Sequence, residues 1–324
     1  MKFEAIREKA AKAWAAFESP TAPLVLVGAG TCGRAAGADE LLEVAAAWKE
    51  KSAPQATVCE VGCLGMCYAE PMVELAGPGR PRVLYADLTP EKFAELLEDF
   101  FGKAEPRADL ALAVTNGEAL EGVPALGELP MIRGQVRIVS RNCGVIDPEN
   151  IEHYIARDGY SGLARALEMK PDDVVEEVKK SGLRGRGGAG FPTGLKWSFC
   201  RKAPGETKYM VCNADEGDPG AFMDREVLES DPHTVLEGMA IAAYAIGAGH
   251  GYVYARAEYP LAVGRLGRSI ATAEKLGLLG EDILGSGFSF HVKVKQGAGA
   301  FVCGEETALL ASIEGRRGMP RPRP

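Results

Sequence analysis

The sequence predicts an α/β protein with two domains, and three observations carry this prediction. The chain has 324 residues, which is enough for two hydrophobic cores. Short apolar runs alternate with longer segments of helical period in both halves of the chain. A stretch of weak periodicity with scattered Gly and Pro lies between the halves. We therefore expect one domain over residues 1–104, a linker over 105–145 and a second domain over 146–324.

The composition is that of a protein that works in water. The hydrophobic fraction is 46%, the charged fraction is 25% and the formal net charge is −8. An acidic protein is repelled by nucleic acid and by anionic membrane surfaces, so we expect neither as a partner. The longest weakly polar stretch, residues 238–249, is too short to cross a bilayer, so we expect no membrane span. Residues 1–19 have a helical period in place of the unbroken apolar core of a secretory leader. These features predict a cytoplasmic protein whose eight cysteines are thiols or metal ligands.

The first domain begins with the amphipathic helix over residues 1–19. Four predicted strands and one helix follow, over 24–28, 56–63, 71–76 and 82–88 for the strands and 38–51 for the helix. Thr89 is an expected N-cap, Pro90 a first-turn proline and Glu91 a first-turn acid, and together they start a last helix over 91–103. The order strand, helix, strand, strand, helix is typical of a compact thioredoxin-like α/β domain.

The second domain opens with helical segments over 147–168 and 170–182. Strands and helices then alternate along the chain. Residues 208–217 are predicted to run from a strand into a loop, and further strands cover 251–259 and 288–297. The predicted helices cover 233–248, 261–277 and 304–315. This alternation predicts a mostly parallel, Rossmann-like α/β sheet.

A cysteine cluster lies in the first domain. Cys59, Cys63 and Cys67 recur every four residues in "CEVGCLGMCYAEP", with glycines between them, and Cys32 stands in the glycine-rich loop "GAGTCGRAAGA" after the first strand. Loops at the ends of neighbouring strands can converge on one centre, and thiolates suit either an iron–sulfur cluster or zinc. Unligated, partly buried thiols are the alternative interpretation.

A glycine-rich loop lies in the second domain, in "LRGRGGAGFPTGLKW" (183–197). Bare backbone allows several N–H groups to converge on an anion such as a phosphate, and Arg186 and Lys196 would add positive charge. The pattern is neither the dinucleotide fingerprint nor a Walker A loop. A flexible surface turn is the simpler alternative.

Polar side chains follow the first predicted strand of this domain, in "NADEGDPGAFMDRE" (213–226). Asn213, Asp215, Glu216 and Asp218 fall at the carboxyl end of that strand, where α/β sheets bind ligands. Carboxylates and amides there can hydrogen-bond ribose hydroxyls or flavin nitrogens. A metal site and a solvated acidic loop are the alternatives.

A second glycine turn, in "GAGAFVCGEETALL" (297–310), leads into a predicted helix with Glu305 and Glu306 at its start. Acids favour helix N-termini in any protein, so this signal is weak by itself.

Taken together, these segments resemble a known family. Residues 131–324 are similar to the FMN- and NADH-binding subunit of respiratory complex I, and to the diaphorase (beta) subunits of NAD-dependent hydrogenases and formate dehydrogenases. The first hundred residues resemble the fused thioredoxin-like [2Fe–2S] domain of the latter group. Cys63 and Cys67 match its second cysteine pair and Cys32 the later member of its first pair, but Val27 stands where the earlier member falls. Cys59 is then the candidate for the fourth ligand.

The resemblance implies roles for specific residues of the second domain. Those implied to hold FMN are Gly185, Arg186, Gly187, Gly188, Lys196, Asn213, Asp215, Glu216, Gly304, Glu305 and Thr307. Phe191 and Phe199 are implied to enclose the adenine of NADH, with Glu306 near the nicotinamide. Asp218 stands where many members have Glu, at a position implied to hold a nucleotide ribose.

The implied activity is that of an NADH:acceptor oxidoreductase of the NADH dehydrogenase type. A hydride passes between NAD(H) and FMN, and single electrons pass to iron–sulfur clusters, with no protein group acting as acid or nucleophile. The implied partners are other redox subunits of a hydrogenase, formate dehydrogenase or related reductase complex, and ferredoxin. The family's C-terminal ubiquitin-like and [4Fe–4S] helical regions are absent from this sequence, which we expect to be truncated at its C-terminal end. The alternative function is a non-catalytic, zinc-binding scaffold or assembly subunit of such a complex.

Overall fold

The computed structural model describes residues 2–116 and 120–322, and it confirms the predicted α/β class. The chain divides into two compact units. The five-stranded unit comprises Glu8–Ala156 and Glu229–Asp231. The three-stranded unit comprises Met1–Arg7, Arg157–Leu228 and Pro232–Pro324. Among the described residues, no helix combines the length and the apolarity that crossing a bilayer would require.

The five-stranded unit contains one mixed sheet. Its strands are β1 (Leu24–Gly28), β2 (Thr57–Val61), β3 (Val73–Ala76), β4 (Val83–Tyr85) and β5 (Ala111–Val114), in the order β2–β1–β3–β4–β5. The first two strands run parallel and every other neighbouring pair is antiparallel. Its helices are α1 (Lys2–Glu18), which belongs to this unit from Glu8 onward, α2 (Thr31–Ala35), α3 (Ala38–Ser52), α4 (Pro90–Leu97), α5 (Pro130–Arg133) and α6 (Ile151–Ala156). A π-helical segment, Glu98–Lys103, extends α4. The four strands and three long helices predicted before residue 104 are confirmed within the described residues.

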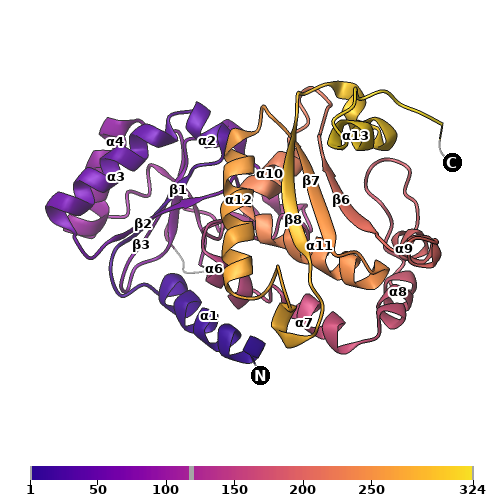
Figure 1. The fold of residues 1–324 in the computed structure, drawn as a ribbon. Coiled ribbons are helices and arrows are strands. Elements are labelled where there is room, and N and C mark those ends of the chain that lie inside the picture. Colours follow the sequence, from indigo (N-terminus) through magenta and orange to yellow (C-terminus); the bar gives the residue numbers. More distant parts are fainter. Residues whose placement is uncertain (1, 117–119, 323–324) are drawn as a thin grey trace. The chain divides into compact units, whose positions relative to one another are not determined.

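Helices cover both faces of this sheet (Figure 1). Val25 and Val27 of β1 pack in the core that α3 and α4 complete, whereas Leu24 and Leu26 lie on the opposite face, where Phe17 of α1 packs. This is the alternation expected of a strand buried on both sides. The side chain of Thr89 accepts a hydrogen bond from the backbone N–H of Lys92, so the predicted N-cap of α4 is confirmed.

The structure differs from the predicted linker. Within residues 105–145, β5 pairs antiparallel with β4 and becomes the last strand of the sheet, and the compact unit continues to Ala156. A four-residue apolar run is too short to reveal a strand by its periodicity, but pairing covers the hydrogen-bonding edge that β4 would otherwise expose. Residues 117–119 of this segment lie outside the described residues.

The three-stranded unit contains a parallel sheet, as predicted. Its strands are β6 (Tyr209–Ala214), β7 (His250–Arg256) and β8 (His291–Gly297), in the order β6–β7–β8. Its helices are α7 (Ser161–Glu168), α8 (Pro171–Lys180), α9 (Thr193–Lys202), α10 (Met223–Ser230), α11 (Pro232–Ile246), α12 (Pro260–Lys275) and α13 (Glu306–Ile313). Parallel strands need long crossovers, which α10, α11 and α12 supply here.

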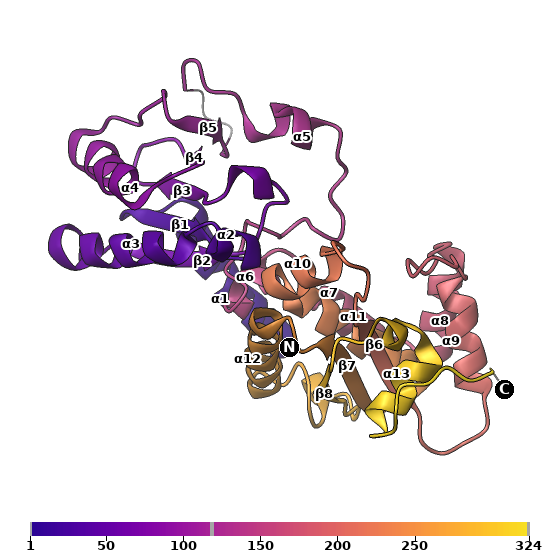
Figure 2. The same ribbon diagram turned by 90° about the horizontal axis from the view of Figure 1, so that it is seen from above.

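Helices lie on both sides of this sheet as well (Figure 2). On β7, a Cβ at Gly251 would point toward Met239 of α11, while Tyr254 packs against Leu309 of α13 on the other face. The hydroxyl of Tyr254 lies 2.8 Å from the hydroxyl of Ser312, which holds α13 against the strand.

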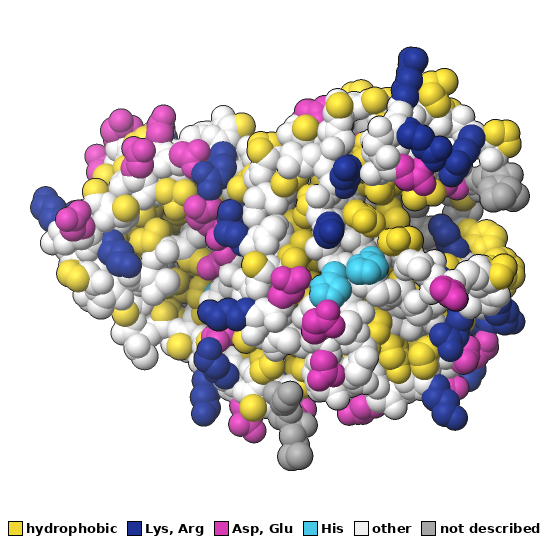
Figure 3. All heavy atoms as spheres, in the orientation of Figure 1, with side chains coloured by type: hydrophobic (Ala, Val, Ile, Leu, Met, Phe, Trp, Pro, Cys, Tyr) yellow, Lys and Arg dark blue, Asp and Glu magenta, His cyan; other side chains and the backbone are white. Residues whose placement is uncertain are grey.

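Two histidine side chains lie side by side on one face of the three-stranded unit (Figure 3), of which His250 is exposed and His291 half-buried. His250 begins β7 and His291 begins β8, and the parallel register pairs them, with ring centroids 5.9 Å apart. The other two, His153 and His233, are buried. The register of the sheet accounts for the proximity of His250 and His291.

Candidate functional site

The carboxyl ends of the three parallel strands meet at one edge of the sheet. β6 ends at Ala214, β7 at Arg256 and β8 at Gly297. Loops leave the sheet at this edge, and open α/β sheets bind ligands there. The predicted loop 213–218 and the predicted turn 297–304 therefore belong to the same edge.

A side chain joins these two segments directly. The amide nitrogen of Asn213 donates a hydrogen bond of 2.9 Å to the carbonyl oxygen of Gly304. Asn213 lies on the α13 face of β6, because Val211, two residues earlier, packs with Tyr254 and Leu309 on that face. The segments also pack closely, since a Cβ on Gly217 would lie 3.2 Å from the Cα of Phe301. Folding thus brings together two motifs that the sequence separates.

Asp215 is a fully buried acid at this edge. In the described part of the chain, neither of its carboxylate oxygens has a hydrogen-bond partner. One of them lies 3.7 Å from the place that a Cβ on Gly304 would occupy. Burial raises the pKa of Asp215, although Arg256 acts in the opposite direction. A buried carboxylate without a donor is costly unless a ligand supplies one.

Glu216 is engaged within the protein. Its carboxylate accepts hydrogen bonds from the backbone N–H groups of Asp224 and Arg225, at 2.8 and 3.1 Å, and from the hydroxyl of Tyr259 at 3.2 Å. Arg256 donates to its carbonyl oxygen at 3.0 Å. These contacts place Glu216 at the N-terminus of α10, where an acid is favoured. The sequence predicted that Glu216 contacts the flavin, but it did not predict that Glu216 caps α10.

The remaining predicted acids and the threonine lie as follows. Glu305 is the N-cap of α13: its carboxylate accepts from the N–H groups of Thr307 and Ala308, both at 3.0 Å, and from the Thr307 hydroxyl. Glu306 is exposed at the first position of α13, and Asp218 is exposed on the loop after β6. Glu305 therefore orients the turn that carries Gly304, beside Asn213.

The glycine-rich loop forms a hairpin-like turn closed on itself. The N–H of Gly185 donates to the carbonyl of Phe191, and the Nε of Arg184 donates to the carbonyl of Gly190 at 2.5 Å. The guanidinium of Arg186 donates to the carbonyl of Arg184. Gly187, Gly188 and Lys196 are exposed, and Lys196 lies in the first turn of α9. The loop thus holds exposed backbone and two exposed cations close to a helix N-terminus.

The two predicted aromatic residues are neighbours. The rings of Phe191 and Phe199 lie 6.5 Å apart, with 51° between their planes, and both side chains are exposed. A flat ring inserted between two others needs about 7 Å, twice the ordinary carbon contact distance. The present separation is slightly less than this, and the planes are tilted.

Three of the four predicted metal ligands come together in the five-stranded unit. The Sγ atoms of Cys32, Cys63 and Cys67 all lie within 4.8 Å of one another, and the last two are 3.6 Å apart. Cys32 lies in α2, and the backbone N–H of Thr31 beside it donates to the carboxylate of Glu229 at 2.8 Å. The three sulfur atoms are soft ligands and lie close together, as a centre that binds a soft metal ion requires.

Cys59 is not part of this group. It lies in β2 opposite Leu26 and packs with Phe17 and Val61 in the apolar cluster beneath α1. The side chains of a strand alternate between faces, and this register turns the Cys59 thiol into the core. The four-residue spacing in the sequence is therefore misleading at this position.

The residue that the sequence analysis missed is Glu70, in the same "CYAEP" segment. Its Oε1 lies 3.8 Å from the Sγ of Cys32, and its side chain is buried. Burial and the nearby Cys32 raise the pKa of Glu70 to about 8. The hydrogen bond with Cys63 lowers the pKa of Cys32 to about 6, while burial raises the pKa of Cys67 and the hydrogen bond with Cys32 raises that of Cys63. The signal that the sequence offered for Glu70 was an acidic residue directly before the predicted strand 71–76.

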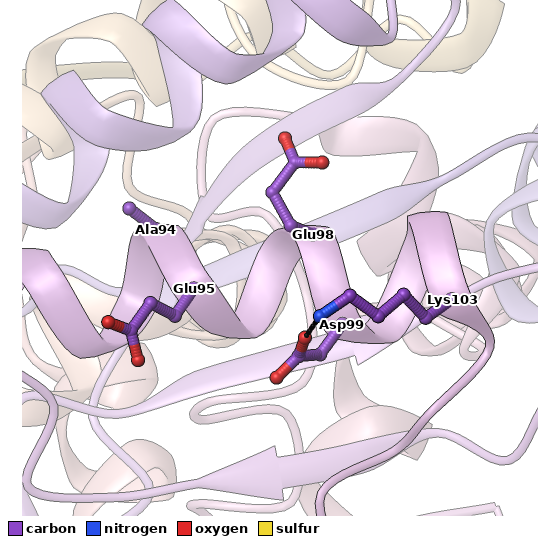
Figure 4. Close-up of a pocket in the computed structure, with 5 residues that line it drawn as sticks. All are labelled: Ala94, Glu95, Glu98, Asp99 and Lys103. Carbon is purple, nitrogen blue, oxygen red and sulfur yellow. Dashed lines mark hydrogen bonds and ion pairs between the residues drawn. The ribbon is translucent and has the colours of Figure 1, made fainter.

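A separate surface hollow of roughly 450 Å³ lies along α4 and its π-helical extension (Figure 4). Its lining residues are Ala94, Glu95, Glu98, Asp99 and Lys103. The ammonium group of Lys103 is 2.7 Å from the carboxylate of Asp99, which also pairs with Arg107. No predicted site residue lines it, and two of its charged side chains are already paired.

The chain is similar to proteins of known activity. Residues 178–324 match the family model of the Nuo51 FMN-binding domain. The chain is 64% identical over 190 residues to the HndC subunit of the NADP-reducing hydrogenase of Solidesulfovibrio fructosivorans, covering 59% of this chain and 39% of that protein. It is 49% identical over 179 residues to a subunit of the NADH-quinone oxidoreductase of Escherichia coli K12, covering 55% of this chain and 40% of that protein.

A solved structure also aligns with nearly the whole chain. It is the NAD⁺-reducing [NiFe]-hydrogenase in its H₂-reduced state, with 26% identity, a TM-score of 0.48, and coverage of 99% of this chain and 51% of that one. The chain spans about two fifths of the length of the two curated relatives named above. Residues 178–324, which carry the strand-end residues and the glycine-rich loop, are thus similar to an FMN-binding domain.

Proposed function

We propose that the chain binds FMN and NAD(H) and serves as the NADH-oxidising flavoprotein part of a larger oxidoreductase. The observation that carries this proposal is the convergence of Asn213, Asp215 and Gly304 at one strand edge, with Asp215 buried and unpartnered among the residues described. This edge lies in the part of the chain that matches an FMN-binding domain. The relatives are named as subunits of an NADP-reducing hydrogenase and of an NADH-quinone oxidoreductase. The proposal applies this kind of activity to the present chain.

The residues at this edge fit the chemistry of FMN. The ribityl chain of FMN carries hydroxyl groups, which are the donors that the Asp215 carboxylate lacks within the described chain. Asn213 already donates to the Gly304 carbonyl, which leaves its amide oxygen directed along the strand end, where it accepts from the N–H of Asp215. The phosphate of FMN needs an anion site, and the glycine-rich loop offers backbone N–H groups with Arg186 and Lys196 beside them.

When bound, FMN takes up a hydride as an electron pair and releases single electrons, which is chemistry that no side chain of the protein supplies. The task of the protein is to bind and orient. Glu305 caps α13 and thereby fixes the Gly304 turn, while Glu216 caps α10 and fixes the loop after β6. Phe191 and Phe199 would hold the adenine of the nucleotide, and Glu306 lies exposed at the α13 end of the same edge. We assign no acid, base or nucleophile to the protein.

The five-stranded unit would receive electrons one at a time. We propose that it is a thioredoxin-like [2Fe–2S] domain, supported by its β2–β1–β3–β4 order with one parallel pair and by its three converging thiols. Its electrons would pass to other redox subunits of a hydrogenase, formate dehydrogenase or related reductase complex in the cytoplasm, with ferredoxin as a further partner.

The test uses the purified chain, reconstituted with FMN under anaerobic conditions. We expect about one FMN per chain, and we expect NADH to bleach the visible absorption of the bound flavin. For a variant of Asn213, Asn150→Ala is the matched control, because Asn150 makes a comparable side-chain hydrogen bond at the start of α6, in the five-stranded unit. A chain that binds no FMN, or whose flavin stays oxidised with NADH and NADPH, would refute the proposal. Bound zinc without flavin would instead support the scaffold alternative.

A further inference from the structure

The three converging thiols have a fourth neighbour of a different kind. The Oε1 atom of Glu70 lies 3.8 Å from the Sγ of Cys32, and the Sγ atoms of Cys63 and Cys67 lie 3.6 Å apart. Two thiolates bound tetrahedrally at about 2.3 Å from one metal ion are about 3.8 Å apart, and a thiolate and a carboxylate oxygen slightly less. Cys32 also lies within 4.8 Å of both other thiols, so the four side chains converge on one centre, and the two printed spacings are those of neighbouring ligands on a tetrahedral ion.

The fold holds Glu70 in this position. Its side chain is 7% exposed, and its second oxygen accepts a hydrogen bond of 2.9 Å from the backbone N–H of Met72. The carboxylate lies over two glycines at the loop that carries Cys32: a Cβ would lie 3.1 Å from it at Gly28 and 3.3 Å at Gly33. Larger residues at either position would displace the acid. One oxygen is thus fixed by the backbone and the other is directed to the thiols.

The position of Glu70 also fills the gap in the cysteine pattern. Val27 stands where the resemblance places a further cysteine, and its side chain is buried in the α3 and α4 core. Cys59 is buried on the other face of the sheet. A buried carboxylate needs compensation by a cation or by donors, and the backbone N–H of Met72 supplies one such donor to Glu70. Carboxylate oxygen is an accepted ligand of tetrahedral metal ions beside thiolates.

We propose that Glu70 is the fourth protein ligand of a [2Fe–2S] cluster in the five-stranded unit. This inference rests on the proposed function, because it takes the cluster from it, but it concerns a different unit of the chain. The site is therefore a three-thiolate, one-carboxylate centre.

The test is anaerobic reconstitution of the full chain with ferrous iron and sulfide. The variants are Glu70→Cys, Glu70→Gln and Glu70→Ala, with Cys59→Ala as the control that removes a cysteine outside the site. We expect two irons and two sulfides per chain in the wild type and in Cys59→Ala. In Glu70→Cys we expect the same iron content with charge-transfer absorption at longer wavelength, because sulfur-to-iron charge transfer needs less energy than oxygen-to-iron transfer. In Glu70→Ala we expect at least half of the iron to be lost on gel filtration.

The isosteric Glu70→Gln variant keeps the hydrogen bond from Met72, and its denaturant unfolding shows whether the unit still folds. Unchanged iron content, visible spectrum and electron paramagnetic resonance in Glu70→Ala and Glu70→Gln would overturn the proposal. So would a wild type that takes up zinc but no iron. Bleaching of FMN by NADH is measured on the same samples, and its failure concerns the proposed function and the three-stranded unit instead.

Discussion

The side-chain amide of Asn213 donates to the backbone carbonyl of Gly304, 91 residues further along the chain, at 2.9 Å. This bond ties the end of β6 to the turn before α13. It connects the two loops that the proposed flavin site requires, and its donor is an exposed side chain that can be changed without opening the core.

Asn213→Ala is expected to weaken FMN binding about tenfold, the effect of losing one to two hydrogen bonds at a site. The loss arises because the Gly304 turn is no longer held against β6. The dissociation constant is measured by the quenching of flavin fluorescence on binding. The stability of the flavin-free chain should change by less than about 1 kcal/mol, since the side chain is exposed. An unchanged dissociation constant, equal to that of Asn150→Ala, would contradict the role of this bond.

Asp215→Asn is expected to stabilise the flavin-free chain and, at the same time, to weaken FMN binding. The Asp215 carboxylate is buried without a partner in the described chain, and its raised pKa means that the charged form is disfavoured by folding. The amide removes this charge, so the flavin-free variant should be more stable at neutral pH by on the order of 1 kcal/mol. FMN binding should weaken, because an acceptor for the ribityl hydroxyls is lost.

Thermal unfolding of the flavin-free protein and flavin titration check the two halves of this prediction for Asp215. A raised carboxyl pKa gives stability that increases as the pH falls, so the wild type should approach the stability of the variant on acidification. A variant that is less stable than the wild type at neutral pH would show that Asp215 makes a structural contact.

Phe199→Ala is expected to affect nucleotide binding and to leave FMN in place. Phe191 and Phe199 are neighbours on the glycine-loop side of the unit, and stacking of a base on an aromatic ring contributes about 1 to 3 kcal/mol. The KM for NADH should therefore rise about tenfold or more, while the flavin content stays near that of the wild type. Tyr209→Ala is the control, because Tyr209 is similarly exposed but begins β6 at the opposite end of the strand. Equal effects of both variants would refute an adenine site.

His153 is expected to make stability depend on pH. It is buried against the rings of Trp14 and Phe17, and its Nδ1 accepts the N–H of Asp147 at 3.2 Å. Burial lowers its pKa to about 4, from 6.5 in an exposed histidine. Between these values the unfolded chain binds the proton and the folded chain does not, so stability falls as the pH falls through this window.

At a pH of about 5 the loss expected from His153 is about 2 kcal/mol relative to neutral pH. Urea unfolding of the wild type and of His153→Asn at both pH values measures it, since asparagine cannot titrate. His233, whose pKa is also lowered by burial to about 3, contributes equally in both proteins and cancels. Parallel losses in the two proteins, or a ring that titrates near its ordinary pKa of 6.5 by nuclear magnetic resonance, would contradict the prediction.

Much of the fold follows from the sequence by local rules. The apolar run 24–28 forms β1, and the sequence Thr89–Pro90–Glu91 starts α4 where it was expected, because N-cap geometry depends only on neighbouring residues. The alternation after residue 208 predicted the parallel sheet, and parallel strands fix which loops share an edge. β5 was missed because its four residues carry little periodicity and are stabilised by pairing with a strand elsewhere in the chain.

The sequence by itself determined that Cys32, Cys63 and Cys67 stand in glycine-rich loops, and that Asn213 and Asp215 follow a strand. Only the tertiary structure decided that Cys59 points into the core and that Glu70 faces the thiols. It also decided that the carboxylate of Glu216 caps α10, whereas the carboxylate of Asp215 is buried at the strand edge. The reason is physical: spacing along the chain fixes which residues can be near one another, but strand register and the packing of distant helices fix which side chains meet.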